Sequence, residues 1–180
     1  MKTYSQLRLM IEEFTKDEVE IANKTSRSAG AVSGKAIVPK YVEEHGNKEH
    51  HILDFGAGKD AIHAKNLHEK GFNVTAHEFG SNQKKGLHDP EALHKKYDHV
   101  YASNVLNVQS SPEMLHKTLD QIHSVIKPGG HFTANLPESP RKHPDLNADM
   151  LHHELSKRFE KVERVGGTKK APLYHSSNPK

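Results

Sequence analysis

The chain contains no cysteine among its 180 residues. Disulfide bonds, thiolate nucleophiles and cysteine-ligated zinc sites are therefore excluded. It also lacks long apolar runs: the first residues are too polar for a signal peptide, and no stretch approaches the length of a membrane span. We therefore expect a cytoplasmic protein that has no membrane partner.

Hydrophobic residues are scarce as well, at 33% of the chain, and the formal net charge is only +3. The length suits one domain with a core of its own, while the low apolar content predicts a very polar surface. Basic and acidic residues alternate along most of the chain, which gives no strong signal for nucleic acid. The 16 histidines, His63 among them, fall mostly in polar stretches and are interpreted as solvated. No repeat or linker divides residues 1–180, so we expect a single domain.

Strand and helix patterns alternate along the chain. Apolar residues at helical spacing predict the helices, and short apolar runs predict the strands. Such alternation is typical of an α/β fold with a doubly wound, mostly parallel sheet, to which the last two strands add an antiparallel edge. The predicted elements are helices at 4–14 and 34–45, a strand at 51–55, a helix at 61–70, strands at 73–78 and 99–103, a helix at 111–126, a strand at 131–136, a helix at 147–159 and strands at 161–165 and 172–176.

The most informative stretch is the end of the first predicted strand, where Asp54 is followed by Gly56 and Gly58. Glycine at such a turn has no Cβ to block a ligand and accepts dihedral angles that other residues avoid. The spacing of Gly56, Gly58 and Ala61 matches the dinucleotide-binding pattern, although a tight turn without a ligand gives the same match. Asp54 would repel a pyrophosphate and suits a cationic amino group.

Polar side chains also follow the next two predicted strands. Glu78 ends the second strand, 20 residues after Gly58, where a carboxylate can accept both hydroxyls of a ribose. The alternative is a solvent-exposed strand end. Ser103 and Asn104 come at the carboxyl end of the next strand, where open α/β sheets bind ligands, although an asparagine that only caps the backbone fits equally well. Together these residues indicate an adenosine-bearing ligand with a positive group nearby.

Residues 50–137 resemble the class I S-adenosylmethionine-dependent methyltransferases. The resemblance is carried by Ile52-Leu53-Asp54-Phe55-Gly56-Ala57-Gly58, by Glu78, by the stretch 97–108, and by the Lys-Pro-Gly-Gly turn at 127–130, all in the family's order. It implies a Rossmann-like fold and S-adenosylmethionine as the methyl donor.

Carried over to this chain, the resemblance assigns a role to each of these positions. Gly56, Ala57 and Gly58 would approach the methionine part of the donor, and Asp54 would hold its ammonium group directly or through water. Glu78 would bind the ribose hydroxyls with Phe79 beside the adenine, while Ser103 and Asn104 would line the methyl end. A helical lid over residues 1–48 would cover the site, with Arg27 within reach of the donor's carboxylate.

The chain departs from the family pattern after Glu78. Only about 20 residues separate this acid from the next clear strand, so the family's third strand and its helix are shortened or missing. The adenine contacts usually found there pass to Leu87, His88 and Asp89. No insertion is large enough for a separate substrate domain.

These observations predict methyl transfer from S-adenosylmethionine, with a small molecule as the first choice of acceptor and RNA or protein next. Positioning and desolvation can supply much of the acceleration, so no general base is required; His77 and His131 lie within strands and are poor candidates. We expect no metal site and make no prediction of the oligomeric state. Two alternatives stay open: a protein that binds S-adenosylmethionine without methyl transfer, and a nicotinamide-dependent oxidoreductase.

Overall fold

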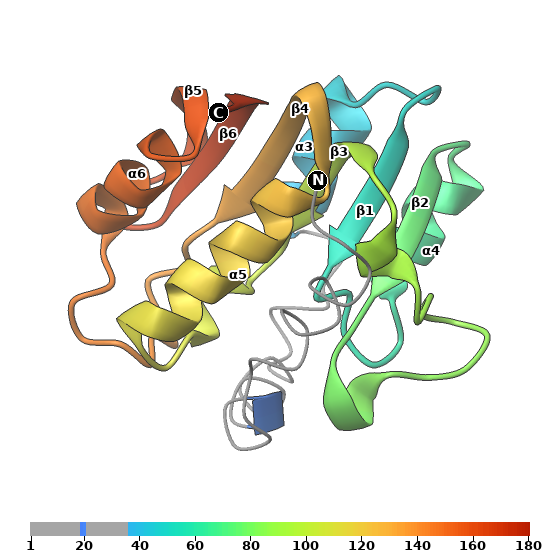
Figure 1. The fold of residues 1–180 in the computed structure, drawn as a ribbon, viewed down its shortest axis with the longest axis horizontal. Coiled ribbons are helices and arrows are strands. Elements are labelled where there is room, and N and C mark those ends of the chain that lie inside the picture. Colours follow the sequence, from blue (N-terminus) through green and yellow to red (C-terminus); the bar gives the residue numbers. More distant parts are fainter. Residues whose placement is uncertain (1–18, 21–35) are drawn as a thin grey trace.

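A six-stranded sheet in the order β2-β1-β3-β4-β6-β5 forms the centre of the protein (Figure 1). The structure, a computed structural model, describes residues 19–20 and 36–180. The predicted helix at 4–14, Arg27 and most of the expected lid lie outside the described residues. The described elements are α3 (Ile37–His45), β1 (His51–Phe55), α4 (Ile62–Glu69), β2 (Asn73–His77), η2 (Gly80–Asn82), η3 (Ala92–His94), β3 (Tyr97–Ala102), η4 (Leu106–Val108), α5 (Pro112–Ser124), β4 (Ile126–Asn135), α6 (Ala148–Ser156), β5 (Phe159–Gly167) and β6 (Pro172–Pro179).

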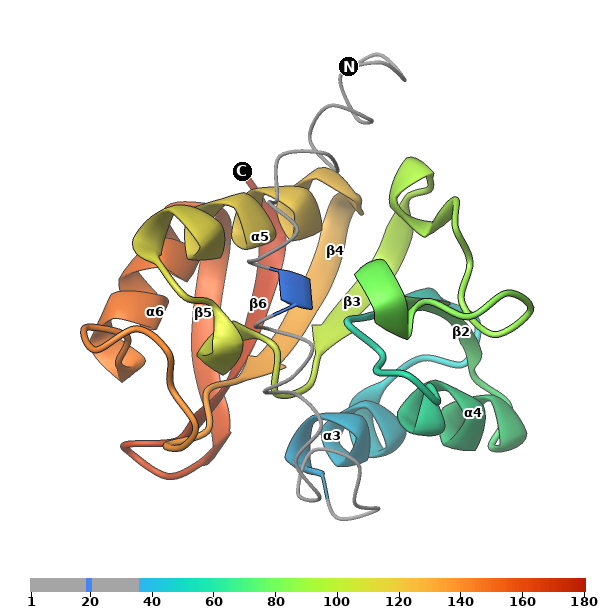
Figure 2. The same ribbon diagram turned by 90° about the horizontal axis from the view of Figure 1, so that it is seen from below.

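The direction of the strands confirms the predicted fold class. β1 pairs in parallel with both β2 and β3, and β3 pairs in parallel with β4. β6 runs antiparallel between β4 and β5, which makes the antiparallel edge. Helices α5 and α6 cover one face of the sheet and α3 and α4 the other, so the sheet is doubly wound (Figure 2).

Side chains of each strand alternate between these two faces. Leu53 and Phe55 of β1 are buried in the larger apolar cluster, which includes Leu115 and Leu119 of α5. Ile52 points to the opposite face and packs with Val38 of α3 in the second cluster. Asp54 lies between Leu53 and Phe55 and therefore shares the face of Ile52.

The edge strand β2 shows what has become of the family's third strand. Between β2 and β3 the described chain forms only the two short 3₁₀ helices η2 and η3. The Asp89 N–H donates to the Ala76 carbonyl at 2.9 Å. Since the His77 carbonyl is turned toward β1, that of Ala76 points to the outer edge of β2. The prediction that the family's third strand is shortened or missing is confirmed. Where that strand would pair with the outer edge of β2, the chain makes the single Asp89–Ala76 backbone hydrogen bond.

Two helices begin at a polar residue whose side chain caps the first turn. Ser111 precedes α5, and its hydroxyl accepts from the Met114 N–H at 3.1 Å. Asn147 caps α6 in the same way through the Met150 N–H, at 2.9 Å. These bonds satisfy N–H groups that have no partner within the helix.

Two sequence predictions need correction. The Lys-Pro-Gly-Gly turn lies inside β4 and does not precede it: Tyr97 pairs with Ile126 and His99 already with His131, so β4 carries extra residues opposite β3. Pro128 cannot donate a ladder hydrogen bond, which explains why this stretch leaves the regular pairing. The histidines are also less solvated than expected, because His63, His77, His88 and His99 are buried.

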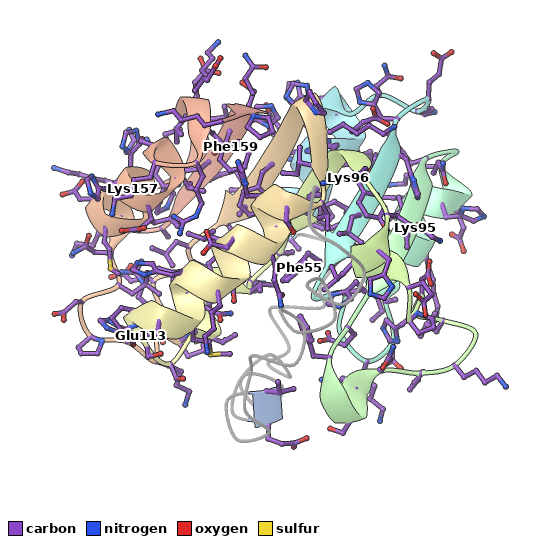
Figure 3. All side chains as sticks on the ribbon, viewed as in Figure 1. Phe55, Lys95, Lys96, Glu113, Lys157 and Phe159 are labelled. Atoms are coloured by element: carbon purple, nitrogen blue, oxygen red, sulfur yellow. The ribbon has the colours of Figure 1, made fainter. Side chains whose placement is uncertain are left out.

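The surface is otherwise polar, as the composition predicts. Charged residues such as Lys157 and Glu113 stand out from the helices, whereas Phe55 and Phe159 are labelled within the body of the molecule (Figure 3). Within residues 19–20 and 36–180, no helix is long and apolar enough to cross a membrane.

Candidate functional site

The glycine turn after β1 is tied to the end of β2 by its backbone. The Gly56 and Ala57 N–H groups both donate to the His77 carbonyl, at 3.0 and 2.8 Å. Gly56 has a φ of +75°, and a Cβ on it would lie 2.7 Å from Cγ2 of Val105. Gly58 has a φ of +78°, but a Cβ there would meet no described atom within 4 Å. Packing therefore requires Gly56, whereas Gly58 faces open space.

Glu78 is held against this turn. Its side chain is only 7% exposed, so the interpretation as a solvent-exposed strand end is wrong. One carboxylate oxygen accepts from the Gly58 N–H at 2.7 Å and the other from the Phe79 N–H at 2.8 Å. Burial raises the pKa of Glu78, and these two N–H groups and His88 oppose the shift. Each oxygen keeps a second lone pair for a further donor.

Asp54 is almost fully buried, with 1% exposure, on the face of the sheet shared with Tyr101. The Tyr101 hydroxyl donates to Oδ2 of Asp54 at 2.8 Å. Burial raises the pKa of Asp54 to about 7; the tyrosine hydrogen bond lowers it, and the nearby Glu78 raises it further. Among the described residues, no lysine, arginine or histidine forms an ion pair with this carboxyl.

Tyr101 is not among the site residues predicted from the sequence, although a signal for it exists. The parallel register of β1 and β3 places Asp54 beside Tyr101. Residues that are neighbours across a sheet share a face, so the predicted strands would have brought the two side chains together had their register been known.

Ser103 and Asn104 lie beyond the end of β3, where they were expected. Asn104 has a φ of +57°, and its N–H donates to Oδ1 of Asn135 at 2.8 Å. The Asn135 amide returns a hydrogen bond to Oδ1 of Asn104, also at 2.8 Å. Asn135 thus holds both the backbone and the side chain of Asn104, whose role at the methyl end stays a prediction. The Ser103 hydroxyl is buried and has no partner among the described residues.

The aromatic side chains beside the turn form one group. The Phe79 ring lies 5.7 Å from that of Phe55 and 4.3 Å from that of His77, centroid to centroid. Burial lowers the pKa of His77 to about 3, which leaves the imidazole neutral and very weakly basic near pH 7. His131 is engaged elsewhere, with its Nδ1 3.2 Å from Nε2 of His175. Neither histidine is suited to act as a general base.

The segment proposed for adenine contacts supports the turn from outside. Nδ1 of His88 accepts from the Lys84 N–H at 2.9 Å, so the proton is on Nε2, which donates to the Gly58 carbonyl at 2.7 Å. Leu87 packs against the small apolar cluster of Ala61, Ala64 and Ala76. Asp89 accepts from Lys95 and from the Glu91 N–H. An adenine contact from these residues stays a prediction.

Together, these features define a class of protein: a Rossmann-like α/β fold with a glycine turn and two buried acids at the carboxyl ends of β1 and β2, the place where such folds bind ligands. A family model described as a methyltransferase domain matches residues 30–164. The chain belongs to this methyltransferase family, and its resemblance to the class I enzymes is confirmed.

Solved structures share the fold at low identity. A Burkholderia thailandensis 1,6-didemethyltoxoflavin-N1-methyltransferase, with 1,6-didemethyltoxoflavin and S-adenosylhomocysteine bound, matches with a TM-score of 0.60 and 16% identity over 100% of this chain and 92% of its own. A Bacteroides fragilis S-adenosylmethionine-dependent methyltransferase in complex with S-adenosylhomocysteine gives 0.60 and 14%, over 81% and 78%.

A Thermus thermophilus 16S rRNA N2 G1207 methyltransferase in complex with S-adenosylmethionine and guanosine matches with a TM-score of 0.59 and 17% identity over 84% of this chain. The match covers only 45% of that enzyme, so this chain spans less than half of its length. No curated protein sequence matches the chain.

Proposed function

We propose that the chain binds S-adenosylmethionine at the carboxyl ends of β1, β2 and β3 and transfers its methyl group to an acceptor. The observation that carries this proposal is Asp54, a buried carboxyl near the end of β1, just before the glycine turn, that has no cationic partner among the described residues. Burying an acid without a cation is costly, and a ligand's ammonium group would remove that cost. The unpartnered Ser103 hydroxyl is a second group that a ligand could satisfy.

The residues present fit this donor. Asp54 would hold the ammonium group, the second lone pairs of Glu78 would accept from the ribose hydroxyls, and Phe79 would lie beside the adenine. When bound, S-adenosylmethionine supplies a methyl group on a sulfonium that is already a good leaving group. The chain's part is to orient the acceptor and to exclude water. The low basicity of His77 agrees with a reaction that needs no strong base.

A small molecule is the acceptor we favour, ahead of RNA and protein. The enzyme from B. thailandensis that holds 1,6-didemethyltoxoflavin is covered over 92% of its length, whereas the rRNA enzyme from T. thermophilus is covered over 45%. The chain is therefore similar in length to the small-molecule enzyme and aligns with nearly all of it. The cytoplasmic location expected from the sequence is part of this proposal.

Two other functions make different demands on the site. Binding of S-adenosylmethionine without methyl transfer is favoured by the missing third strand, which removes a usual wall of the adenine site. A nicotinamide-dependent oxidoreductase is disfavoured by Asp54, because a buried acid beside the glycine turn would repel a pyrophosphate.

Calorimetry with S-adenosylmethionine, S-adenosylhomocysteine and NAD separates these functions. We expect both sulfur ligands to bind and NAD not to bind; binding of NAD alone would overturn the proposal. Incubation with a radiolabelled methyl donor and a fractionated cell extract then distinguishes an enzyme from a binder. Label in the small-molecule fraction supports the favoured acceptor, and label in RNA or protein replaces it.

Removing either acid tests the site itself. Asp54→Ala and Glu78→Ala should each weaken S-adenosylmethionine binding by about 1–3 kcal/mol, because each removes a hydrogen bond to a charged or polar ligand group. Asp60→Ala is the matched control, since Asp60 is exposed in the same turn and pairs with Lys84. Calorimetry on all three variants, with thermal melts to confirm folding, makes the comparison. Unchanged affinity in both site variants would mean that the two acids are only structural.

A further inference from the structure

Strand β5 offers an open edge for another strand. It stands at the end of the sheet and pairs only with β6 among the described strands. The strand is nine residues long, which leaves a row of backbone N–H and C=O groups on its outer side. Edges of this kind pair with other chains unless the sequence prevents it.

The side chains along this edge are charged, with signs that alternate. Glu160, Lys161, Glu163 and Arg164 are all exposed. Val162 lies between the two pairs and packs on the larger apolar cluster. Val165, at 37% exposure, is the one large apolar side chain that is exposed in the part of the chain described.

The two pairs of charges divide between the faces of the sheet. Glu160 and Arg164 share the parity of Val162, which packs on the side of α6. Lys161 and Glu163 point to the side of α3, in agreement with the influence of Glu163 on the pKa of Tyr41. Lys161 and Glu163 already form an ion pair at 3.2 Å along the strand.

We propose that a second copy of the chain pairs with β5 in antiparallel orientation, with the two Val162 residues opposite each other. This register sets Glu160 against the partner's Arg164, and Lys161 against the partner's Glu163. By two-fold symmetry each pair occurs twice, so every charge of the segment faces the opposite sign. The two sheets then continue into one.

The charge pattern selects this register over its neighbours. A shift by one residue in one direction sets Glu160 against the partner's Glu163. A shift in the other direction sets Lys161 against the partner's Arg164. Parallel pairing in register sets every charge against its own kind. Like charges directly opposite are destabilising in sheets, so one arrangement alone satisfies all four side chains.

Charged residues also serve to block the edges of sheets, usually as lysines that repel any approaching copy. On β5 the signs of the charges alternate. The charges therefore repel a second copy in the other registers and attract it in the antiparallel register centred on Val162. The exposed Val165 adds apolar surface at the end of the paired segment, where it would contact the partner. The proposal does not depend on methyl transfer or on the donor site.

Two single charge reversals test the pairing. Sedimentation velocity over a concentration series should show the wild-type chain in a monomer–dimer equilibrium. Glu160→Arg sets two arginines against each other at both symmetry-related pairs, and Arg164→Glu sets two glutamates against each other. Each variant alone should raise the dimer dissociation constant by about tenfold or more. Lys169→Glu, a reversal in the exposed turn beyond β5, is the control and should leave the dimer unchanged.

Mixing the two variants gives the sharpest result. A Glu160→Arg copy opposite an Arg164→Glu copy restores opposite charges at both pairs, so the mixture should form a heterodimer with a dissociation constant near the wild-type value, about tenfold or more below that of either variant's homodimer. Circular dichroism melts establish that both variants are folded. A monomeric wild-type chain at all concentrations overturns the proposal, and so does a dimer that is insensitive to both reversals. Binding of S-adenosylmethionine, measured separately, is expected in monomer and dimer alike.

Discussion

The parallel strands bury acids near their carboxyl ends and histidines nearer their amino ends. Where β1 and β2 end, Asp54 and Glu78 are buried acids whose pKa values are raised. Nearer the start of β3, on the face covered by α3, lies a histidine cluster of His99, His131 and His175. Its pKa values are lowered, to about 3 for His99 and about 4 for His175, because burial disfavours the charged form.

The two regions differ in how far their polar groups are satisfied. In the histidine cluster the Thr133 hydroxyl bridges Nε2 of His99 at 2.8 Å and Nδ1 of His175 at 2.9 Å. The other nitrogen of His175 lies 3.2 Å from Nδ1 of His131. Asp54 has one partner, the hydroxyl of Tyr101, and no cation in the described part of the chain. A closed hydrogen-bond chain is typical of structure, and an incompletely satisfied acid is typical of a ligand site.

The largest expected effect is an opposite pH dependence of stability at the two ends. As pH falls below 6.5, the unfolded chain protonates His99 and the folded chain does not, so this residue reduces stability toward acid. Asp54 acts in the other direction, since its folded pKa of about 7 exceeds the unfolded value of 3.8 and the folded chain takes up the proton first. Each term amounts to about 2–3 kcal/mol between pH 6.5 and 4.5, and because the signs are opposite the two sites differ by about 4–6 kcal/mol.

Urea unfolding at these two pH values measures both terms. His99→Gln should reduce the loss of unfolding free energy toward pH 4.5, and Asp54→Asn should increase it. If both variants show the wild-type change in unfolding free energy between pH 6.5 and 4.5, then His99 and Asp54 do not have opposite effects on stability.

The next effect is a difference in stability cost between alanine at Gly56 and alanine at Gly58, the two glycines of the turn after β1. Both have positive φ, so alanine is strained at each by about 1–2 kcal/mol. Gly56→Ala also drives a methyl group against Val105, and we expect a total loss of about 2–4 kcal/mol in unfolding free energy. Gly58→Ala meets open space and should cost only the strain, while weakening S-adenosylmethionine binding. Denaturant unfolding compares the two variants, and equal losses would show that packing on Val105 does not matter.

The smallest expected effect is the change in ligand affinity when the Tyr101 hydroxyl, which donates to Asp54, is removed. This hydrogen bond lowers the pKa of Asp54, so Tyr101→Phe should raise it and move the pH above which S-adenosylmethionine binds upward. At pH 7 the affinity should fall by about 0.5–1.5 kcal/mol, with recovery toward the wild-type value at higher pH.

Tyr97→Phe is the control for Tyr101→Phe, because its buried hydroxyl donates to the Ala92 carbonyl at 2.7 Å. Calorimetry across pH distinguishes the two variants. A uniform loss of affinity at every pH would assign Tyr101 a packing role only.

Much of the fold could be predicted because its signals are local. The strand at 51–55 was placed correctly from its apolar run, and Ser111 marked the start of α5 because a cap bonds within the same turn. The Lys-Pro-Gly-Gly turn was placed before β4, because its position inside the strand depends on the register with β3. The buried histidines were missed for the same reason: His99 begins the predicted strand at 99–103, but which face it takes and what covers that face depend on the packing of α3 on the sheet.

The amino-acid sequence by itself determined the order of the elements, the glycine turn with Asp54 before it, and the acid at the end of β2, because these depend on residues adjacent along the chain. Only the tertiary structure decided that Tyr101 meets Asp54, that Glu78 holds the Gly58 N–H, and that His99, Thr133 and His175 join in one hydrogen-bond chain. Those contacts link residues far apart in sequence, and strand register and burial, which no local pattern encodes, bring them together.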